Sequence, residues 1–165
     1  MLLVCTAAAF AQSSESEWKS SYERQVRNVG YAGVGVETII NKWEAAMPES
    51  PDMFLARFNF NYEKAQSIQV VPKDKKKYLG LDPVLTLKDS LDNDIYYFQE
   101  IFFDDDLYAE ALRAVDRAIA CNDLELRYIL SKITALTAYE KESPDMAASE
   151  LEAFIDRYVA TKSRP

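Results

Sequence analysis

The sequence predicts a mainly α-helical protein in which antiparallel helix pairs stack as an α-solenoid, with a short β-hairpin inserted near the middle of the chain. Three observations support this. Apolar residues recur at helical spacing through both ends of the chain. Similar patterns return after 36 and 72 positions. A central segment lacks helical spacing and is rich in β-branched and aromatic residues.

The composition is that of a folded domain that lacks several common catalytic groups. Of its 165 residues, 48% are apolar and 28% are charged, which suits a globular chain with a buried core. The net charge of −8 would repel a phosphate backbone, so nucleic acid is not expected as a partner. There is no histidine, which removes Ser-His-Asp and Cys-His catalysis and histidine metal sites. We therefore expect a protein that is not an enzyme and holds no cofactor or metal.

Residues 1–11 have the features of a signal peptide. A short apolar run ends with Ala9 and Ala11 at positions −3 and −1 of a cleavage site, and a polar segment follows at once. The run is too short to span a bilayer, although no basic residue follows the initiator methionine. We expect export to the periplasm or secretion, no transmembrane segment, and a mature domain of residues 12–165. A buried N-terminal helix and a lipoprotein anchored at Cys5 are the alternatives.

Three helices are predicted in the first part of the chain. A capping box of Ser14 and Glu17 marks the start of the first helix, and the glycine-rich turn "GYAGVG" ends it. The second carries an apolar stripe that includes Trp43, and the prolines of "PESPD" stop it. The predicted helices cover about residues 15–28, 36–47 and 54–65.

Three further helices are predicted in the last third. Asp104, Asp105 and Asp106 precede the first of them, where carboxylates cap a helix and complement its dipole. Calcium binding is the alternative use of these groups. Cys121 is expected to be a small core residue that closes an apolar helix face. The apolar stripes cover about residues 108–119, 126–136 and 148–158.

One spacing of residues recurs along the chain. Positions separated by 4, 3 and 5 return 72 residues later, and the 4 and 3 spacing returns after 36 more. Because 72 is twice 36, one period of helix-turn-helix units fits all three stretches. The repeat positions are Ile39, Trp43, Ala46 and Pro51; Ala111, Val115, Ala118 and Asp123; and Ala147, Leu151 and Phe154.

This pattern resembles the tetratricopeptide repeat family, whose second helix has a small residue, an aromatic residue, an alanine and a proline at this spacing. The stretch "YAEALRAVDRAIACND" matches best, while Val115 replaces the aromatic residue and Asp123 the proline. A signal peptide before degenerate repeats is similar to the uncharacterised secreted tetratricopeptide proteins of Gram-negative bacteria. The resemblance implies a fold and a compartment rather than an activity.

Residues 68–103 break the period and are expected to form an insertion between helix pairs. Within them, residues 83–99 have β-branched and aromatic side chains on both sides of the polar "DSLDND", which predicts a β-hairpin. The alternative is a helix that begins at Asp94. The residues of the insertion that could contact a partner, or else pack in the core, are Tyr96, Tyr97 and Phe98.

Two classes of function fit these features. The first is a non-catalytic protein–protein interaction scaffold of the bacterial envelope, because stacked helix pairs create a concave surface for a protein or peptide. The alternative is a carbohydrate-binding module or hydrolase that uses the aromatic insertion. The final helix is expected to keep an uncovered apolar strip, or to pair with another copy of the chain, because solenoids need a polar cap. This would also fit a chain that is part of a longer array.

Overall fold

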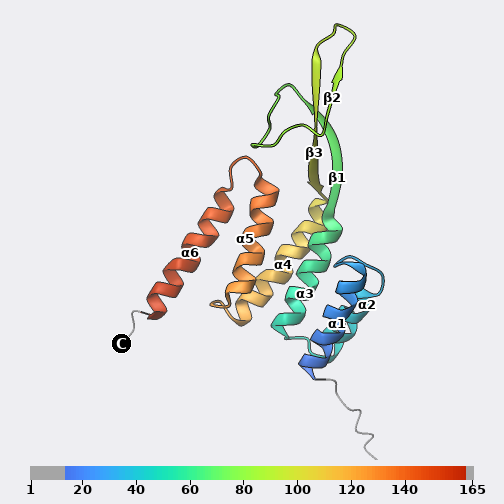
Figure 1. Ribbon diagram of the computed structural model, residues 1–165. Coiled ribbons are helices and arrows are strands. Elements are labelled where there is room, and N and C mark those ends of the chain that lie inside the picture. The colour runs from blue at the N-terminus through green and yellow to red at the C-terminus, as the bar shows by residue number, and fades with distance from the viewer. Residues whose placement is uncertain (1–13, 163–165) are drawn as a thin grey trace, which may run out of the picture.

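The computed structural model describes residues 14–162, so the predicted signal peptide lies outside the described residues. In this range six helices pack side by side in an array, with α1 in front of α2 in this view, and a three-stranded antiparallel sheet projects from α3 and α4 (Figure 1). None of these helices is long and apolar enough to cross a membrane. The elements are α1 (Glu15–Val29), α2 (Val36–Ala46), α3 (Pro51–Ala65), β1 (Gln66–Lys73), β2 (Leu85–Lys88), β3 (Asp94–Phe103), α4 (Asp105–Cys121), α5 (Leu126–Glu140) and α6 (Asp145–Lys162).

The helix starts follow the predicted capping signals. Ser14 and Glu17 form the capping box at the start of α1, and the Asp104 side chain accepts a hydrogen bond from the Leu107 amide at 3.0 Å at the start of α4. Ser50 caps α3 in the same way, at 3.2 Å from the Met53 amide. These side chains satisfy amide groups that the first helical turn leaves without partners. The starts of α1 and α4 were therefore located well from sequence, whereas α3 begins three residues before its predicted start.

The sheet is inserted between α3 and α4, where the insertion was predicted, and these two helices also pack on each other. α3 runs directly into β1, and β3 leads through Asp104 into α4. The Asp104 amide donates to the Ala65 carbonyl at 2.8 Å, which closes the base of the sheet. α3 and α4 form the most extensive helix–helix contact, and α5 packs on α6. β1 and β3 therefore prolong the antiparallel pair of α3 and α4.

The sheet has the order β1-β3-β2 and is antiparallel throughout. The predicted hairpin is present as β2 and β3, and the alternative helix beginning at Asp94 is not formed. The added strand is β1, which pairs along its whole length with β3, from Gln66 opposite Phe103 to Lys73 opposite Tyr96. The insertion is therefore a three-stranded sheet rather than a two-stranded hairpin.

The helical core contains most of the repeat positions. Trp43, Ala111, Val115 and Ala118 are fully buried, and Ala147 and Phe154 are buried or nearly so. Ile39, Ala46 and Pro51 are half-buried, whereas Asp123 is exposed in the turn after α4. Leu151, which corresponds to Trp43 and Val115, is 41% exposed because it lies on the end helix, α6.

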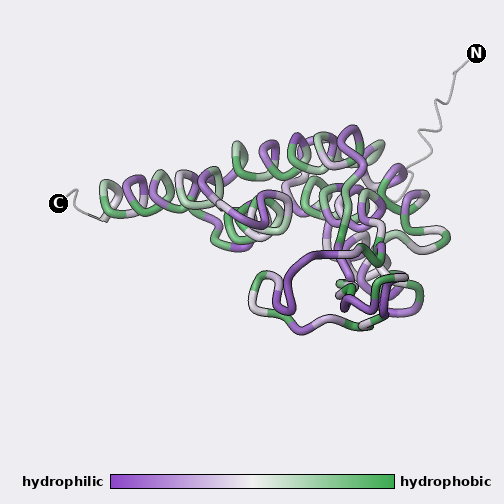
Figure 2. Tube along the Cα trace, turned by 90° about the horizontal axis from the view of Figure 1, so that it is seen from above, coloured by the Kyte–Doolittle hydropathy of each residue, from purple (hydrophilic) through white to green (hydrophobic). Residues whose placement is uncertain are grey.

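Of two predictions about the helix surfaces, one is wrong and the other is confirmed. Cys121 is exposed at the end of α4 instead of being a core residue. The uncovered apolar strip on the last helix is confirmed, because Leu151, Ile155 and Val159 are 41–54% exposed. Seen from above, α6 extends away from the rest of the array (Figure 2).

Candidate functional site

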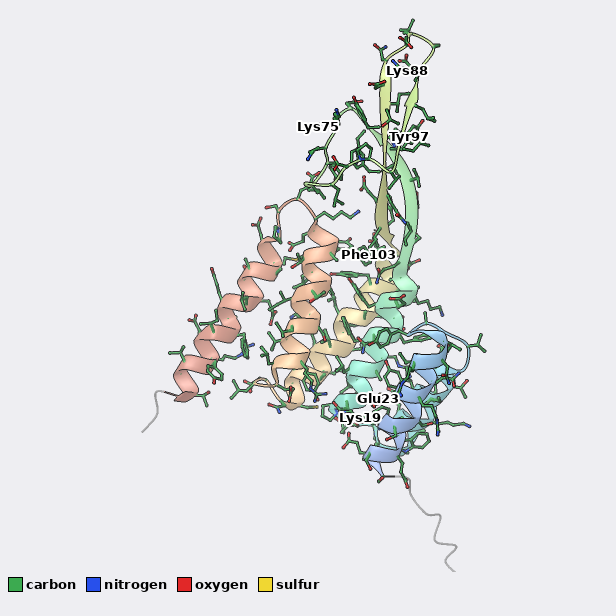
Figure 3. The ribbon with its side chains drawn as sticks, in the orientation of Figure 1. Lys19, Glu23, Lys75, Lys88, Tyr97 and Phe103 are labelled. Atoms are coloured by element: carbon green, nitrogen blue, oxygen red, sulfur yellow. The ribbon has the colours of Figure 1, made fainter. Side chains whose placement is uncertain are left out.

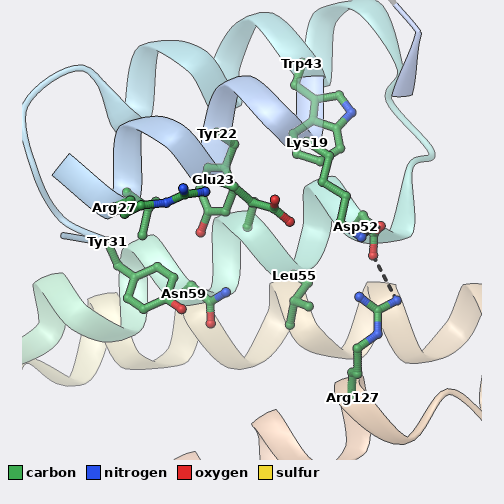
Figure 4. Close-up of a pocket in the computed structure, with 12 residues that line it drawn as sticks. Lys19, Tyr22, Glu23, Arg27, Tyr31, Trp43, Asp52, Leu55, Asn59 and Arg127 are labelled. Carbon is green, nitrogen blue, oxygen red and sulfur yellow. Dashed lines mark hydrogen bonds and ion pairs between the residues drawn. The ribbon is translucent and has the colours of Figure 1, made fainter. Parts of the chain in front are cut away.

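A hollow of about 360 Å³ lies where α1, α3 and the first turn of α5 meet (Figure 4). Its polar rim carries Lys19 and Arg27 from α1, Asn59 from α3 and Arg127 from α5. Its apolar wall includes Leu55 of α3. Helices that are distant in sequence thus supply one surface, as expected where paired helices stack side by side.

Asp52 joins the three helices at one end of the hollow. Its carboxylate lies 2.7 Å from the Lys19 ammonium of α1 and 3.3 Å from the Arg127 guanidinium of α5. It also accepts a hydrogen bond from the Tyr128 hydroxyl at 3.1 Å. Burial alone would raise the pKa of Asp52, but the hydrogen bond and charge of Lys19, helped by Arg127, outweigh burial and lower the pKa. A carboxylate held in this way is ionised at neutral pH and is poorly suited to donate a proton.

Two buried donors in the wall of the hollow have no hydrogen-bond partner among the described residues. They are the Tyr22 hydroxyl and the Trp43 indole nitrogen, whose side chains are 7% and 0% exposed. The two rings pack together with centroids 6.4 Å apart. Burial raises the pKa of Tyr22, although the nearby Asn59 amide partly offsets this effect.

A second hollow, of about 310 Å³, continues the first between α3 and α5. Tyr31 and Asn59 line both. The second is more apolar in character, with Phe58, Tyr62 and Leu130 among its side chains. We call the surface formed by the two hollows the helical groove. It combines aromatic and aliphatic surface with separated polar groups, which suits an extended peptide better than a small polar substrate.

Sequence reasoning missed most groove residues, although one of the repeat positions, Trp43, lies in its wall. The signal was present in α1. There Lys19, Glu23 and Arg27 each come directly after a residue of the apolar stripe of that helix. A stripe of this kind identifies the buried face of a helix. It does not tell which polar residues beside the stripe will face a neighbouring helix.

The three aromatic residues singled out in the insertion do not form one surface. Successive strand residues point to opposite faces, so Tyr97 lies on one face of β3, and Tyr96 and Phe98 lie on the other. Phe98 is 2% exposed and packs edge-on against Tyr78 with centroids 5.9 Å apart. The carboxylate nearby, Glu100, has a lowered pKa because Lys73 binds it at 2.7 Å. This lowering is larger than the rise in pKa that the partial burial of Glu100 causes.

No protein-family model, no curated protein and no solved structure matches this chain.

Proposed function

We propose that this protein is a non-catalytic interaction scaffold of the bacterial envelope that holds an extended segment of a partner protein in the helical groove. The observation that carries the proposal is the pair of adjoining hollows across α1, α3 and α5, which share Tyr31 and Asn59. The rim of the groove also carries separated polar groups, among them Arg27 and Asn59, that could bind a peptide backbone. A peptide backbone offers a carbonyl acceptor at every residue.

The proposal includes a tetratricopeptide-like array as the source of the groove. Trp43 of α2 and Val115 of α4 are 72 positions apart and are both 0% exposed. Ala111 and Ala118, which flank Val115 at the repeat spacing, are also 0% exposed. Small residues at these places let neighbouring helices approach closely. The location in the envelope depends on the signal peptide predicted in residues 1–11.

The proposal can be tested with peptides selected from a random-peptide phage library on the mature chain. The affinity of each selected peptide would be measured by isothermal titration calorimetry against wild type and two groove variants, Arg27→Ala and Asn59→Ala. We expect each variant to weaken binding by about tenfold, equivalent to about 1.4 kcal/mol.

Arg113→Ala is the matched control, because Arg113 is an exposed arginine on α4 outside the groove, as Arg27 is an exposed arginine on α1. The proposal predicts unchanged affinity in this control. The proposal would be contradicted if no peptide were selected, or if Arg27→Ala and Arg113→Ala lost equal amounts of affinity.

A further inference from the structure

The sheet has one face without any charged side chain. The register places Ile68 opposite Ile101, Pro72 opposite Tyr97, and Leu85 opposite Tyr97 from the other side. Alternate residues of each strand belong to the same face. We call this surface the charge-free face, and its members are Gln66, Ile68, Val70 and Pro72 of β1, Leu85 and Leu87 of β2, and Ile95, Tyr97, Gln99, Ile101 and Phe103 of β3.

Every charged residue of the three strands lies on the opposite face. The strand residues concerned are Lys73, Lys88, Asp94 and Glu100. Lys73 binds Glu100 at 2.7 Å and lies 4.2 Å from the centre of the Tyr78 ring. Part of the opposite face is thus covered by the chain's own loop and ion pairs. Lys88 marks the end of the sheet distant from the helices (Figure 3).

The charge-free face itself is open to solvent. Ile68 and Val70 are 64% and 57% exposed, Leu85 and Leu87 are each 47% exposed, and Ile101 is 37% exposed. A shallow hollow at the edge of β3 joins Ile68 and Ile101 to Leu81, Asp82 and Val84 of the connecting loop and to Phe98, and it is not counted as part of the face. At roughly 150 Å² for a fully exposed large side chain, the five strand residues present on the order of 400 Å² of apolar surface. Patches of this size commonly mark interaction sites.

We propose that two copies of this chain associate by packing their charge-free faces against each other about a two-fold axis. A two-fold axis places the same surface of both copies in contact. A face without charged side chains can meet its copy in this way without burying two like charges against each other. Two copies would bury about 800 Å², which is below the size of a stable, specific interface and corresponds to a weak, transient dimer. The sheet projects beyond the helices (Figure 1), so the two helical arrays can remain apart.

Face-to-face packing fits the sheet better than pairing through an edge. The outer edge of β1 contains Pro72, which has no backbone N–H to donate, and the other edge strand, β2, has four residues. Such edges resist the addition of another strand. Two stacked sheets with apolar inner faces form a core of the β-sandwich kind.

The test is sedimentation equilibrium of the mature chain over a wide range of concentration and salt. We expect a monomer–dimer equilibrium with a Kd on the order of 10–100 µM. Dimers should be stronger at high salt, because screening reduces repulsion between two chains of net charge −8. Val70→Lys and Leu87→Lys should each weaken the dimer at least about tenfold. Gln69→Lys and Thr86→Lys, at neighbouring exposed positions on the opposite face, should leave it unchanged.

A second measurement on the wild-type chain keeps the test independent of variant folding. Methyl NMR spectra recorded at increasing concentration should show shifts at Ile68, Val70 and Leu87 and none at Ile155 of α6. A chain that stays monomeric up to about 1 mM would overturn the proposal. This outcome includes a chain that binds phosphatidylglycerol vesicles but does not form dimers. A dimer that survives Val70→Lys and Leu87→Lys, or shifts confined to α6, would also overturn it.

Discussion

The Asp52 carboxylate accepts a hydrogen bond from the Tyr128 hydroxyl at 3.1 Å and so links the start of α3 to the start of α5. With the ion pairs to Lys19 and Arg127, this contact holds one end of the helical groove. The Asp52 side chain is 19% exposed, so the attraction between these groups is only partly screened by water.

Asp52→Asn is expected to lower the free energy of unfolding by about 1–2 kcal/mol, because the amide cannot form the two ion pairs. Urea denaturation followed by circular dichroism measures this loss. Asp123→Asn, at an exposed turn position, is the control and should leave the midpoint unchanged. Equal midpoints for Asp52→Asn and wild type would show that the link contributes little.

Stability should fall in acid through Asp52 and Glu100. The folded pKa of each lies below its ordinary value, 3.8 for Asp52 and 4.5 for Glu100. The unfolded chain therefore binds protons first as the pH drops, so the stabilisation is complete above these ordinary values and is lost as the pH falls toward the lower folded values. Urea midpoints at about pH 6 and about pH 3.5 should differ less in Asp52→Asn and Glu100→Gln than in wild type. An equal difference in all three proteins would be inconsistent with this account.

Equivalent repeat positions should differ in their effect on stability according to what covers them. Trp43→Ala should cost about 3–5 kcal/mol and Val115→Ala about 2 kcal/mol, because both side chains are fully buried. Leu151→Ala should cost under about 1 kcal/mol, since Leu151 is 41% exposed. Chemical denaturation of the three variants provides the comparison. A loss for Leu151→Ala as large as that for Val115→Ala would mean that α6 is covered in solution.

The sheet should move more freely when the ion pairs of Glu100 are removed, because one of them joins the sheet to the helical array. Glu100 of β3 binds Lys73 at 2.7 Å and Lys141, in the turn after α5, at 3.5 Å. Glu100→Gln should therefore increase amide hydrogen exchange in residues 74–84 while exchange in α3 stays the same. Gln99→Glu, on the other face of β3, is the control for a change of charge. Identical exchange in Glu100→Gln and wild type would contradict the role given to this cluster.

The helices could be located from sequence because their signals are local. Capping residues such as Ser14 and Asp104, and apolar stripes such as that containing Trp43, act within a few residues of each other. β1 was missed because its partner, β3, follows about 30 residues later, and pairing at that distance leaves no short-range pattern. Cys121 was misplaced because helical spacing does not reveal which end of a stripe reaches solvent.

The groove could not be derived from sequence for a related reason. Lys19, Asp52 and Arg127 belong to three helices, and their meeting depends on how far each helix is displaced along its neighbour. The repeat period fixes the order of the helices but not these displacements.

The central claim is that the helical groove binds a peptide, and NMR chemical-shift mapping tests it most directly. A peptide selected on the mature chain would be titrated into the ¹⁵N-labelled protein. The account predicts shifts concentrated at Lys19, Arg27, Asn59 and Arg127, on α1, α3 and α5, with little change in β1 and β3. Shifts confined to the sheet or to α6, or spread evenly over the chain, would contradict it.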